Sequence, residues 1–212
     1  MTYKKIWFVR HGESLKNIAE IHGGSGDNLT NTGQKQCLQL SKMISAKSKK
    51  NSRIVLVGHN VRQVAASMDI FASNFKCKKI FDDRIKGIHL GIANGISRDE
   101  LKHKSPNDAK RLELWRENKL KINELKLTGM EQINNFKNRI VNFLESCYNN
   151  SYDTIIVICT TSVMIMVLNL IVLQKKFSYR LYRHYRVHTN DYIFISYKNG
   201  KIDINDTNIN ML

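Results

Sequence analysis

The stretch KIWFVRHGES, residues 5–14, joins a short apolar run directly to a polar segment that contains a glycine. The apolar run, Lys5 to Val9, has the composition of a buried strand, and it ends abruptly at Arg10, His11 and Gly12. A strand that ends in polar residues plus glycine, before a helical pattern, is typical of the site of an open α/β sheet. We therefore predict a central strand over Lys5–Val9 whose carboxyl end opens onto a functional site.

Strand and helix signals alternate along the rest of the chain. From apolar spacing, caps and turn residues we predict elements at 30–44 (helix), 53–57 (strand), 61–72 (helix), 109–125 (helical), 133–147 (helix), 154–159 (strand), 162–173 (helix), and 192–197 with 201–204 (hairpin around Asn199-Gly200). The segment 80–99 is irregular and rich in glycine. Buried strands joined by helices imply a three-layer α/β/α fold with a mostly parallel sheet. We expect one domain over 1–212, with a helical insertion at about 96–128.

Composition and charge narrow the class of protein. Of 212 residues, 42% are apolar and 25% are charged, as in an ordinary globular domain. The net charge of +16, from 34 basic and 18 acidic residues, favours anionic partners such as phosphorylated metabolites, nucleic acid or acidic membranes. The basic runs Lys47–Arg53 and Lys175–Arg186 carry no nucleic-acid-binding signature, so solvated faces are the simpler interpretation.

Cysteines and apolar runs bear on compartment. Four cysteines stand far apart without a CxxC pair, which excludes a disulfide framework or a cysteine metal site, and three of them are expected to be buried thiols. The chain begins MTYKK without an apolar signal segment, so we expect a cytoplasmic protein. Residues 154–173 are long enough to span a membrane, but polar residues interrupt them. A buried strand followed by a buried helix is the favoured interpretation.

The RHGES segment has the residues that phosphoryl transfer to a histidine requires. A phosphoryl-accepting imidazole must be neutral, fixed in orientation, and surrounded by positive charge and N–H donors. Arg10 offers a bidentate clamp for phosphate oxygens and disfavours protonation of His11. Ser14 and Asn17 add neutral donors, and Gly12 lets the backbone approach the phosphate closely. The alternative is a chance RHG in a loop, which the preceding strand and the following Asn17 make less attractive.

These motifs resemble those of the histidine phosphatase (phosphoglycerate mutase-like) superfamily. Its members share the RHGES-type motif and a helix start of the form LTxxGxxQ, which here spans Leu29–Gln36. A strand ending in SPxxR corresponds to Gly58–Arg62, and the resemblance makes Arg62 the second phosphate clamp. A GGES-like helix start is echoed weakly at 129–132, followed by the family's arginine at Arg139. The resemblance implies a phosphoglycerate mutase-like fold and a reaction that uses no metal and no cofactor.

Two positions depart from the family pattern. The family's second histidine, which contacts the transferring phosphoryl group, corresponds to Thr160, and its glutamate general acid corresponds to Gly87. Loss of a general acid costs about 10²–10⁴-fold in rate. Loss of an electrostatic partner of the transition state costs roughly 10²–10³-fold. Thr160 is still expected to face the phosphate pocket.

Two histidines are candidate replacements. His59 follows the second predicted strand near Arg62 and could contact phosphate in place of the missing histidine. His89 lies two residues after the vacant acid position and could protonate a leaving oxygen. The competing interpretations are a turn histidine for His59 and an ordinary surface or core histidine for His89.

The sequence therefore leaves two main hypotheses. His11 with Arg10 and Arg62 favours a phosphoric monoester hydrolase that works through a phosphohistidine, whereas Thr160 and Gly87 favour an inactive member that only binds a phosphorylated ligand. We expect weak hydrolysis, and no efficient mutase, because each passage of a mutase needs the missing acid. The expected partner is a small phosphorylated substrate or a phosphoprotein. Nucleic acid rests on charge alone, and specificity is expected to lie in 80–128.

Overall fold

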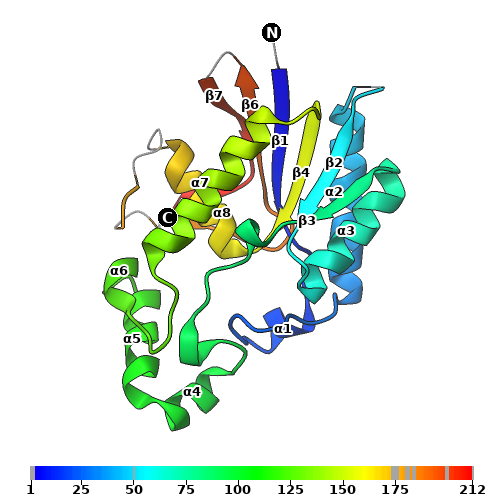
Figure 1. Cartoon of the computed structure of the whole chain (residues 1–212). Helices are drawn as coiled ribbons and strands as arrows, with labels where there is room; N and C mark the ends of the chain where they lie inside the picture. The colour runs from blue at the N-terminus through cyan, green and yellow to red at the C-terminus, as the bar shows by residue number, and fades with distance from the viewer. Residues whose placement is uncertain are drawn as a thin grey trace.

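A six-stranded sheet forms the centre of the molecule (Figure 1). The computed structural model describes residues 3–49, 51–172, 177–179, 182, 185–198 and 201–211. The strand order is β3-β2-β4-β1-β6-β7, with β1 Tyr3–Arg10, β2 Ile54–Gly58, β3 Lys78–Phe81, β4 Thr154–Cys159, β6 Tyr192–Lys198 and β7 Lys201–Thr207. The neighbours from β3 to β1 pair in parallel, and β6 and β7 pair antiparallel. The predicted mostly parallel sheet, with a central first strand and a terminal hairpin, is confirmed.

The sequence pattern did not predict strand β3. The expected irregular segment 80–99 begins inside β3, because Ile80 and Phe81 pair with the end of β2. Lys78, Lys79 and Phe81 are exposed at this edge of the sheet, so the strand shows no alternation of buried and exposed residues. Lysines on an edge strand also discourage pairing with other chains. The prediction failed here because edge strands need little apolar surface.

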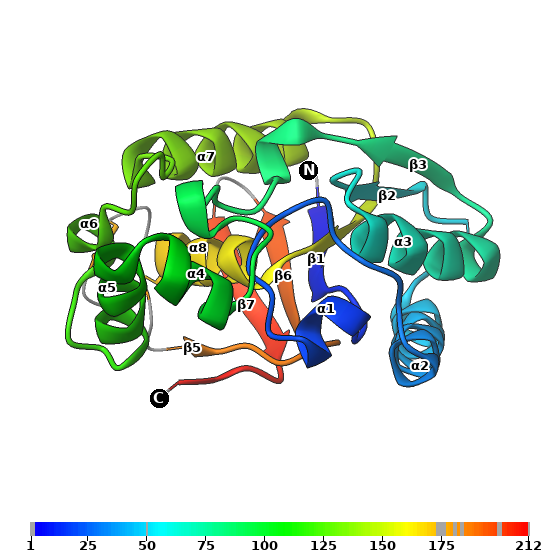
Figure 2. The ribbon, with the colours of Figure 1, turned by 90° about the horizontal axis from the view of Figure 1, so that it is seen from below.

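Alternate residues of the strands supply two separate cores. Ile6 and Phe8 of β1 join the cluster formed with α7 (Ile133–Asn149) and α8 (Thr161–Val172). Trp7 and Val9 join the cluster formed with α2 (Asn31–Lys47) and α3 (Arg62–Phe75). Figure 2 shows α7 and α2 on opposite sides of the strands. Since side chains alternate along a strand, one apolar run covers both faces of the sheet.

Three short helices occupy the range of the predicted insertion. They are α4 (Arg98–Lys104), α5 (Pro106–Arg116) and α6 (Ile122–Leu125). The helical stretch expected over 109–125 is broken, because Asn118 adopts a left-handed conformation (φ 59°) and the Lys119 N–H closes onto the Leu114 carbonyl at 2.8 Å. Leu101, Leu112 and Leu125 belong to the same buried cluster as α7. The insertion therefore extends the main core.

The remaining elements are short. They comprise α1 (Leu15–Ile18), the 3₁₀ turns η1 (Asp83–Ile85) and η2 (Gly91–Ala93), and a two-stranded sheet of β5 (Tyr185–Arg186) with β8 (Asn210–Met211). Figure 1 places α1 and the insertion beyond the carboxyl ends of β1, β2 and β4. Leu173, Asn199-Gly200 and much of the basic run Lys175–Arg186 lie outside the described residues. In the part of the chain that the structure describes, no helix combines the length and apolar character of a membrane span.

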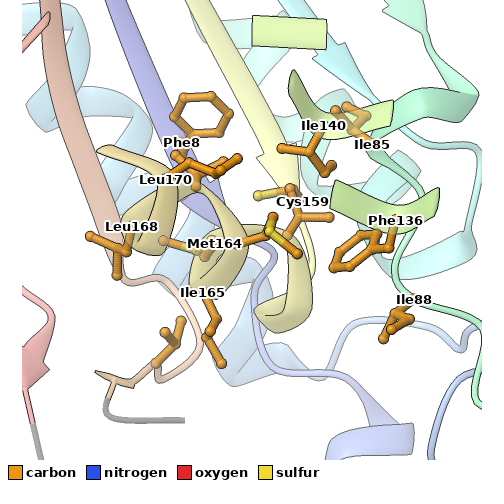
Figure 3. Close-up of a cluster of buried hydrophobic side chains, with 14 of the residues drawn as sticks. Phe8, Ile85, Ile88, Phe136, Ile140, Cys159, Met164, Ile165, Leu168 and Leu170 are labelled. Carbon is orange, nitrogen blue, oxygen red and sulfur yellow. The ribbon is translucent and has the colours of Figure 1, made fainter. Parts of the chain in front are cut away.

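Phe136 tests the core that joins α7 to the sheet. Its side chain is fully buried among Ile85, Ile88 and Met164 of the same cluster (Figure 3). Phe136→Ala is expected to lower the free energy of unfolding by about 3–5 kcal/mol, because it removes a large apolar side chain and leaves a cavity. Urea denaturation measures this, with Leu38→Ala as the control. Leu38 is 42% exposed, so that variant should change stability by less than about 0.5 kcal/mol.

Candidate active site

A cavity of about 690 Å³ lies at the carboxyl ends of β1 and β4, between α1 and the insertion. This volume is in the range that holds metabolite-sized ligands. The lining comes from four parts of the chain and includes Arg10, His11, Lys16, Asn17, Glu20 and His22 from the first strand and loop, Gln63 from α3, Gly87, Arg98, Trp115, Arg116 and Asn118 from the segment around the insertion, and Thr160, Ser162, Tyr182 and Val187 from the last third.

His11 is held at the end of β1 in one tautomer. Its backbone N–H donates to the Cys159 carbonyl at 3.1 Å, which fixes the end of β1 against β4. Its ring Nδ1 lies 2.8 Å from the Gly12 carbonyl oxygen. Because a carbonyl only accepts, Nδ1 carries the proton and Nε2 keeps its lone pair. The side chain is only 3% exposed. Burial, and then the charge of Arg10, lower its pKa to about 3, so the ring is neutral near pH 7.

Arg10 is a half-buried cation beside this ring. Its Nη1 donates to the Val187 carbonyl at 2.8 Å. Within the described residues its buried Nε has no hydrogen-bond partner. Burial lowers the pKa of the guanidinium to about 10, against the opposing effect of Asp191, and leaves it charged at neutral pH. A half-buried cation whose buried donor is unsatisfied favours a bound anion in the cavity that it lines.

Ser14 and Asn17 form the start of α1. Both the backbone N–H and the hydroxyl of Ser14 donate to Asn17 Oδ1, at 3.0 and 2.9 Å. Ser14 is fully buried and does not belong to the described lining of the cavity, whereas Asn17 does. Since Asn17 uses its oxygen toward Ser14, the N–H groups are what it can offer to the cavity. Ser14 therefore orients Asn17 in this structure, and its direct contact with phosphate stays a prediction.

Gly12 and α3 support the histidine loop from behind. The Gly12 N–H donates to Ser67 Oγ at 3.2 Å. A Cβ on Gly12 would lie 2.4 Å from the Gly33 carbonyl oxygen and 2.8 Å from Cys37 Sγ. In this structure Gly12 approaches the first turn of α2 closely, and its expected approach to phosphate stays a prediction. Packing of the loop against that turn requires a glycine here.

Thr160 and Gly87 are neighbours in the lining of the cavity. The family resemblance assigns their positions to the second histidine and the general acid. Both line the cavity, as expected from their places in the motifs. A Cβ on Gly87 would lie 2.9 Å from Thr160 Oγ1, and that hydroxyl is 3.2 Å from Ser162 Oγ. Small neutral groups therefore occupy the two positions at which the resemblance implies a cation and a proton donor in other family members.

Arg139 fixes the segment that carries Gly87. Its guanidinium donates to the carbonyls of Arg84 at 2.7 Å and Gly87 at 3.1 Å, and it also contacts the Lys86 carbonyl. Two further bonds, at 2.8 and 2.9 Å, join it to the Glu131 carboxylate. The sequence flagged Arg139 only as a weak motif residue. The structure gives it a mechanical role, because one guanidinium ties α7 to three carbonyls of the segment 84–87 beside the cavity.

Three expected site residues are absent from the described lining of the cavity. Within the described residues, the lining of the cavity does not include Arg62, His59 or His89. Arg62 is exposed at the first position of α3, and its buried neighbour Gln63 lines the cavity instead. The His59 ring lies 3.4 Å from Asp83, and His89 is exposed with its Nδ1 accepting from the Gly91 N–H at 3.1 Å. A role in phosphate contact stays a prediction for each of them.

The part of the cavity lining that α1, the loop after it and the insertion provide, here called the mouth, is strongly cationic. Besides Arg10, it is lined by Lys16, Arg98 and Arg116, against the single carboxylate of Glu20 among the described lining residues. Arg98 pairs with Glu20 at 3.2 Å, and Arg116 contacts the ring of His22. Burial, and then the charge of Arg116, lower the pKa of His22 to about 4.

Sequence reasoning missed Gln63 and the cations of the mouth. The net charge of the chain indicated anionic ligands in general. No local pattern identified Lys16, Arg98 and Arg116 as parts of one site, because they converge from separate segments.

The comparison with known families settles the class. The sequence model described as "Histidine phosphatase superfamily (branch 1)" matches residues 6–210. The chain belongs to the histidine phosphatase superfamily. The resemblance to this superfamily that was inferred from the sequence is therefore confirmed.

Relatives in this superfamily include phosphatases and mutases. A protein named "Probable phosphoglycerate mutase GpmB" from Photorhabdus laumondii is 28% identical over 98 residues, which are 46% of this chain and 44% of that protein. The chain thus spans a little under half the length of the curated relatives that it matches.

Two solved structures resemble the whole fold. The alpha-ribazole phosphatase from Shigella flexneri has a TM-score of 0.76 at 18% identity and covers 96% of each chain. A phosphoglycerate mutase from Bacillus anthracis has a TM-score of 0.72 at 13% identity and covers 96% of this chain and 92% of that one. At such identities the likeness shows the phosphoglycerate mutase-like fold alone.

The buried histidine of this family member predicts a pH dependence of stability. Folding lowers the pKa of His11 from its ordinary value to about 3, so its contribution to stability is complete above pH 6.5 and is lost as the pH falls. Between pH 7 and pH 5 the expected loss is about 2 kcal/mol. Urea denaturation of wild type and His11→Gln at both values should show that the variant loses about 2 kcal/mol less.

His103→Gln is the control for this measurement, because His103 is exposed. It should follow the wild type. Equal losses in wild type and His11→Gln would contradict a neutral His11 in the folded protein.

Proposed function

We propose that this histidine phosphatase family member hydrolyses phosphomonoesters through a phosphohistidine at His11. The observation that carries the proposal is the state of that ring. A buried, neutral imidazole, with Nδ1–H bound to the Gly12 carbonyl and Nε2 left as a nucleophile, lines a cationic cavity of metabolite size. A histidine used only for structure has no need of a free Nε2 next to an arginine that lines the same cavity.

The proposed reaction has two steps. Nε2 of His11 attacks phosphorus, and the bond between phosphorus and the leaving oxygen breaks. Water then attacks the phosphohistidine and returns the electron pair to Nε2. Arg10 holds the phosphate charge throughout, and the Asn17 amide donates to a phosphate oxygen. The Gly12 carbonyl stabilises the positive charge that develops on the ring, because it accepts from Nδ1 in both steps.

The substrate class follows from the charges and from the relatives. The cations around the mouth favour an anionic ligand beyond a single phosphate oxygen, and the volume admits a small phosphorylated metabolite. The alpha-ribazole phosphatase and phosphoglycerate mutase with this fold are named for substrates of that size. A phosphorylated side chain of another protein could reach the same histidine only with its chain passing through the cationic mouth.

A second candidate function is phosphate-ester binding without turnover. It is favoured by one observation, which is that Thr160 and Gly87 leave neither a cation nor an acid at the family positions. The same two residues argue that any hydrolysis is slow and that mutase activity is inefficient. A mutase needs proton transfer at two different oxygens of one substrate, whereas hydrolysis of an ester with a good leaving group does not.

Turnover that depends on His11 is the central test. Phosphate release from p-nitrophenyl phosphate and a panel of phosphorylated metabolites should be measurable in wild type. It should be abolished in His11→Ala, because that substitution removes the imidazole that attacks phosphorus. Rapid quenching should trap a phosphoryl group on the wild-type chain that is stable in alkali and labile in acid. His103→Ala, on the exposed face of α4, is the matched control and should keep wild-type activity.

Three outcomes separate the alternatives. Phosphate binding with no turnover on any ester would favour the binding function. Release that survives in His11→Ala would contradict the phosphohistidine. Conversion of 3-phosphoglycerate at tens per second, within the usual range of enzyme kcat, would contradict the expectation of an inefficient mutase.

Restoring an imidazole at position 160 should raise the rate. Thr160 lines the cavity beside Gly87, so an imidazole placed there would border the same space as His11. Thr160→His should increase kcat on p-nitrophenyl phosphate by up to about 10²-fold, or tighten phosphate binding, because it adds a donor near the transferring group. Ser73→His on the exposed side of α3 controls for the added imidazole. No change in either quantity would show that another group has taken over the role.

A further inference from the structure

Lys16 is a cavity residue that the family's machinery does not explain. It lies five residues after His11, on α1, and it lines the same cavity as His11, Thr160 and Gly87. The side chain is partly buried. Its charge helps to lower the pKa of the His11 ring, so the ammonium acts on the nucleophile through space. A partly buried ammonium in a phosphate cavity is costly unless it has a task there.

The position of the ammonium is fixed at both ends. The bonds from Ser14 to Asn17 set the start of α1, and Nζ donates to the carbonyl of Gly23. Gly23 adopts a left-handed conformation (φ 56°), and a Cβ there would lie 1.8 Å from Asn94 Oδ1. The carbonyl that holds Lys16 is therefore locked against the segment that leads into the insertion. One bond to a carbonyl leaves two ammonium protons for other acceptors.

The charges around Lys16 favour an acidic ammonium. Burial lowers the pKa of Lys16, and the charge of Asp27 opposes this. Within the described part of the chain, Lys16 forms no ion pair with a carboxylate. The other charged or titratable groups of the described lining are Arg10, His11, Glu20, His22, Arg98, Arg116 and Tyr182, and the carboxylate of Glu20 is paired with Arg98. Lys16 is thus a proton donor that no carboxylate holds.

We propose that Lys16 is the general acid of this enzyme and supplies the proton that the residue at position 87 cannot. This inference rests on the proposed hydrolysis at His11. It accounts for a cavity in which the usual acid and the second histidine are both absent while the nucleophile and its clamp are retained. It also assigns a function to Lys16, the cation of α1 whose charge acts on the His11 ring.

The proton balance closes over the two steps. As Nε2 of His11 bonds to phosphorus, the bond to the ester oxygen breaks, and Lys16 passes one proton from Nζ to that oxygen, which leaves as an alcohol. Lys16 is then a neutral amine. In the second step it takes a proton from the attacking water, whose oxygen bonds to phosphorus as the bond to Nε2 breaks. Phosphate leaves, and the ammonium and the neutral imidazole are regenerated.

The test compares two esters that differ in their need for an acid. An alkyl phosphate such as glycerol 3-phosphate leaves as a strongly basic oxygen, whereas p-nitrophenyl phosphate leaves with little protonation. Lys16→Met should lower kcat on the alkyl ester by about 10²–10⁴-fold and on p-nitrophenyl phosphate by less than about tenfold. Lys16→Arg should behave like Lys16→Met on the alkyl ester, because a guanidinium keeps the charge but does not release a proton.

The pH profile provides a second measurement. The acid must be protonated, so wild-type kcat on the alkyl ester should fall as the pH rises through the lowered pKa of Lys16, and this alkaline limb should disappear in Lys16→Met. Lys42→Met, on the exposed side of α2, is the matched control and should leave both esters and the profile unchanged. Circular dichroism of each variant confirms that α1 and the sheet remain folded.

The outcomes distinguish this proposal from the one on which it rests. Equal losses on the two esters, or rescue of the alkyl ester by Lys16→Arg, would overturn the role of Lys16 as an acid while hydrolysis at His11 stands. Turnover on the alkyl ester that is unchanged in Lys16→Met would do the same. Absence of any turnover that His11→Ala removes would overturn the hydrolysis itself, and the role of Lys16 with it.

Discussion

The hydrogen bond from His11 Nδ1 to the Gly12 carbonyl is the constraint on which the site depends. It selects the tautomer that leaves Nε2 as a nucleophile, and its acceptor belongs to the very next residue of the chain. The bond persists only because β1 ends between β4 and β6, where Cys159 and Asp191 hold the backbone of His11 and Arg10. The chemistry of the ring is thus a consequence of where a buried strand stops.

Keeping the half-buried Arg10 beside the buried His11 has a free-energy cost that the fold offsets. A guanidinium without full hydrogen bonding and a desolvated imidazole both destabilise the empty site. Two apolar layers, on opposite faces of the same strands, provide the compensating burial. Active sites commonly retain such local instability, because groups that are satisfied in the free protein have less to offer a ligand.

The insertion and the first loop together form the mouth of the cavity. Gly95 donates to the His22 carbonyl, Arg116 contacts the His22 ring, and Arg98 pairs with Glu20. These contacts join two segments that the sheet does not hold together. They bring positive charge to the entrance and lock the loop that carries Gly23. Substrate selection and the position of Lys16 therefore share one mechanical element.

The sequence by itself determined the layers, the central strand ending in RHG and the terminal hairpin. It also produced the hypothesis that Thr160 and Gly87 replace two family residues. Each of these depends on apolar period or on a local motif, which a few neighbouring residues specify. Only the tertiary structure decided that Gln63, Lys16 and Arg116 line one cavity with His11, that Arg139 anchors the Gly87 segment, and that the described lining omits Arg62. Those relations depend on strand order and on how distant segments pack, and no short-range pattern in the chain records either.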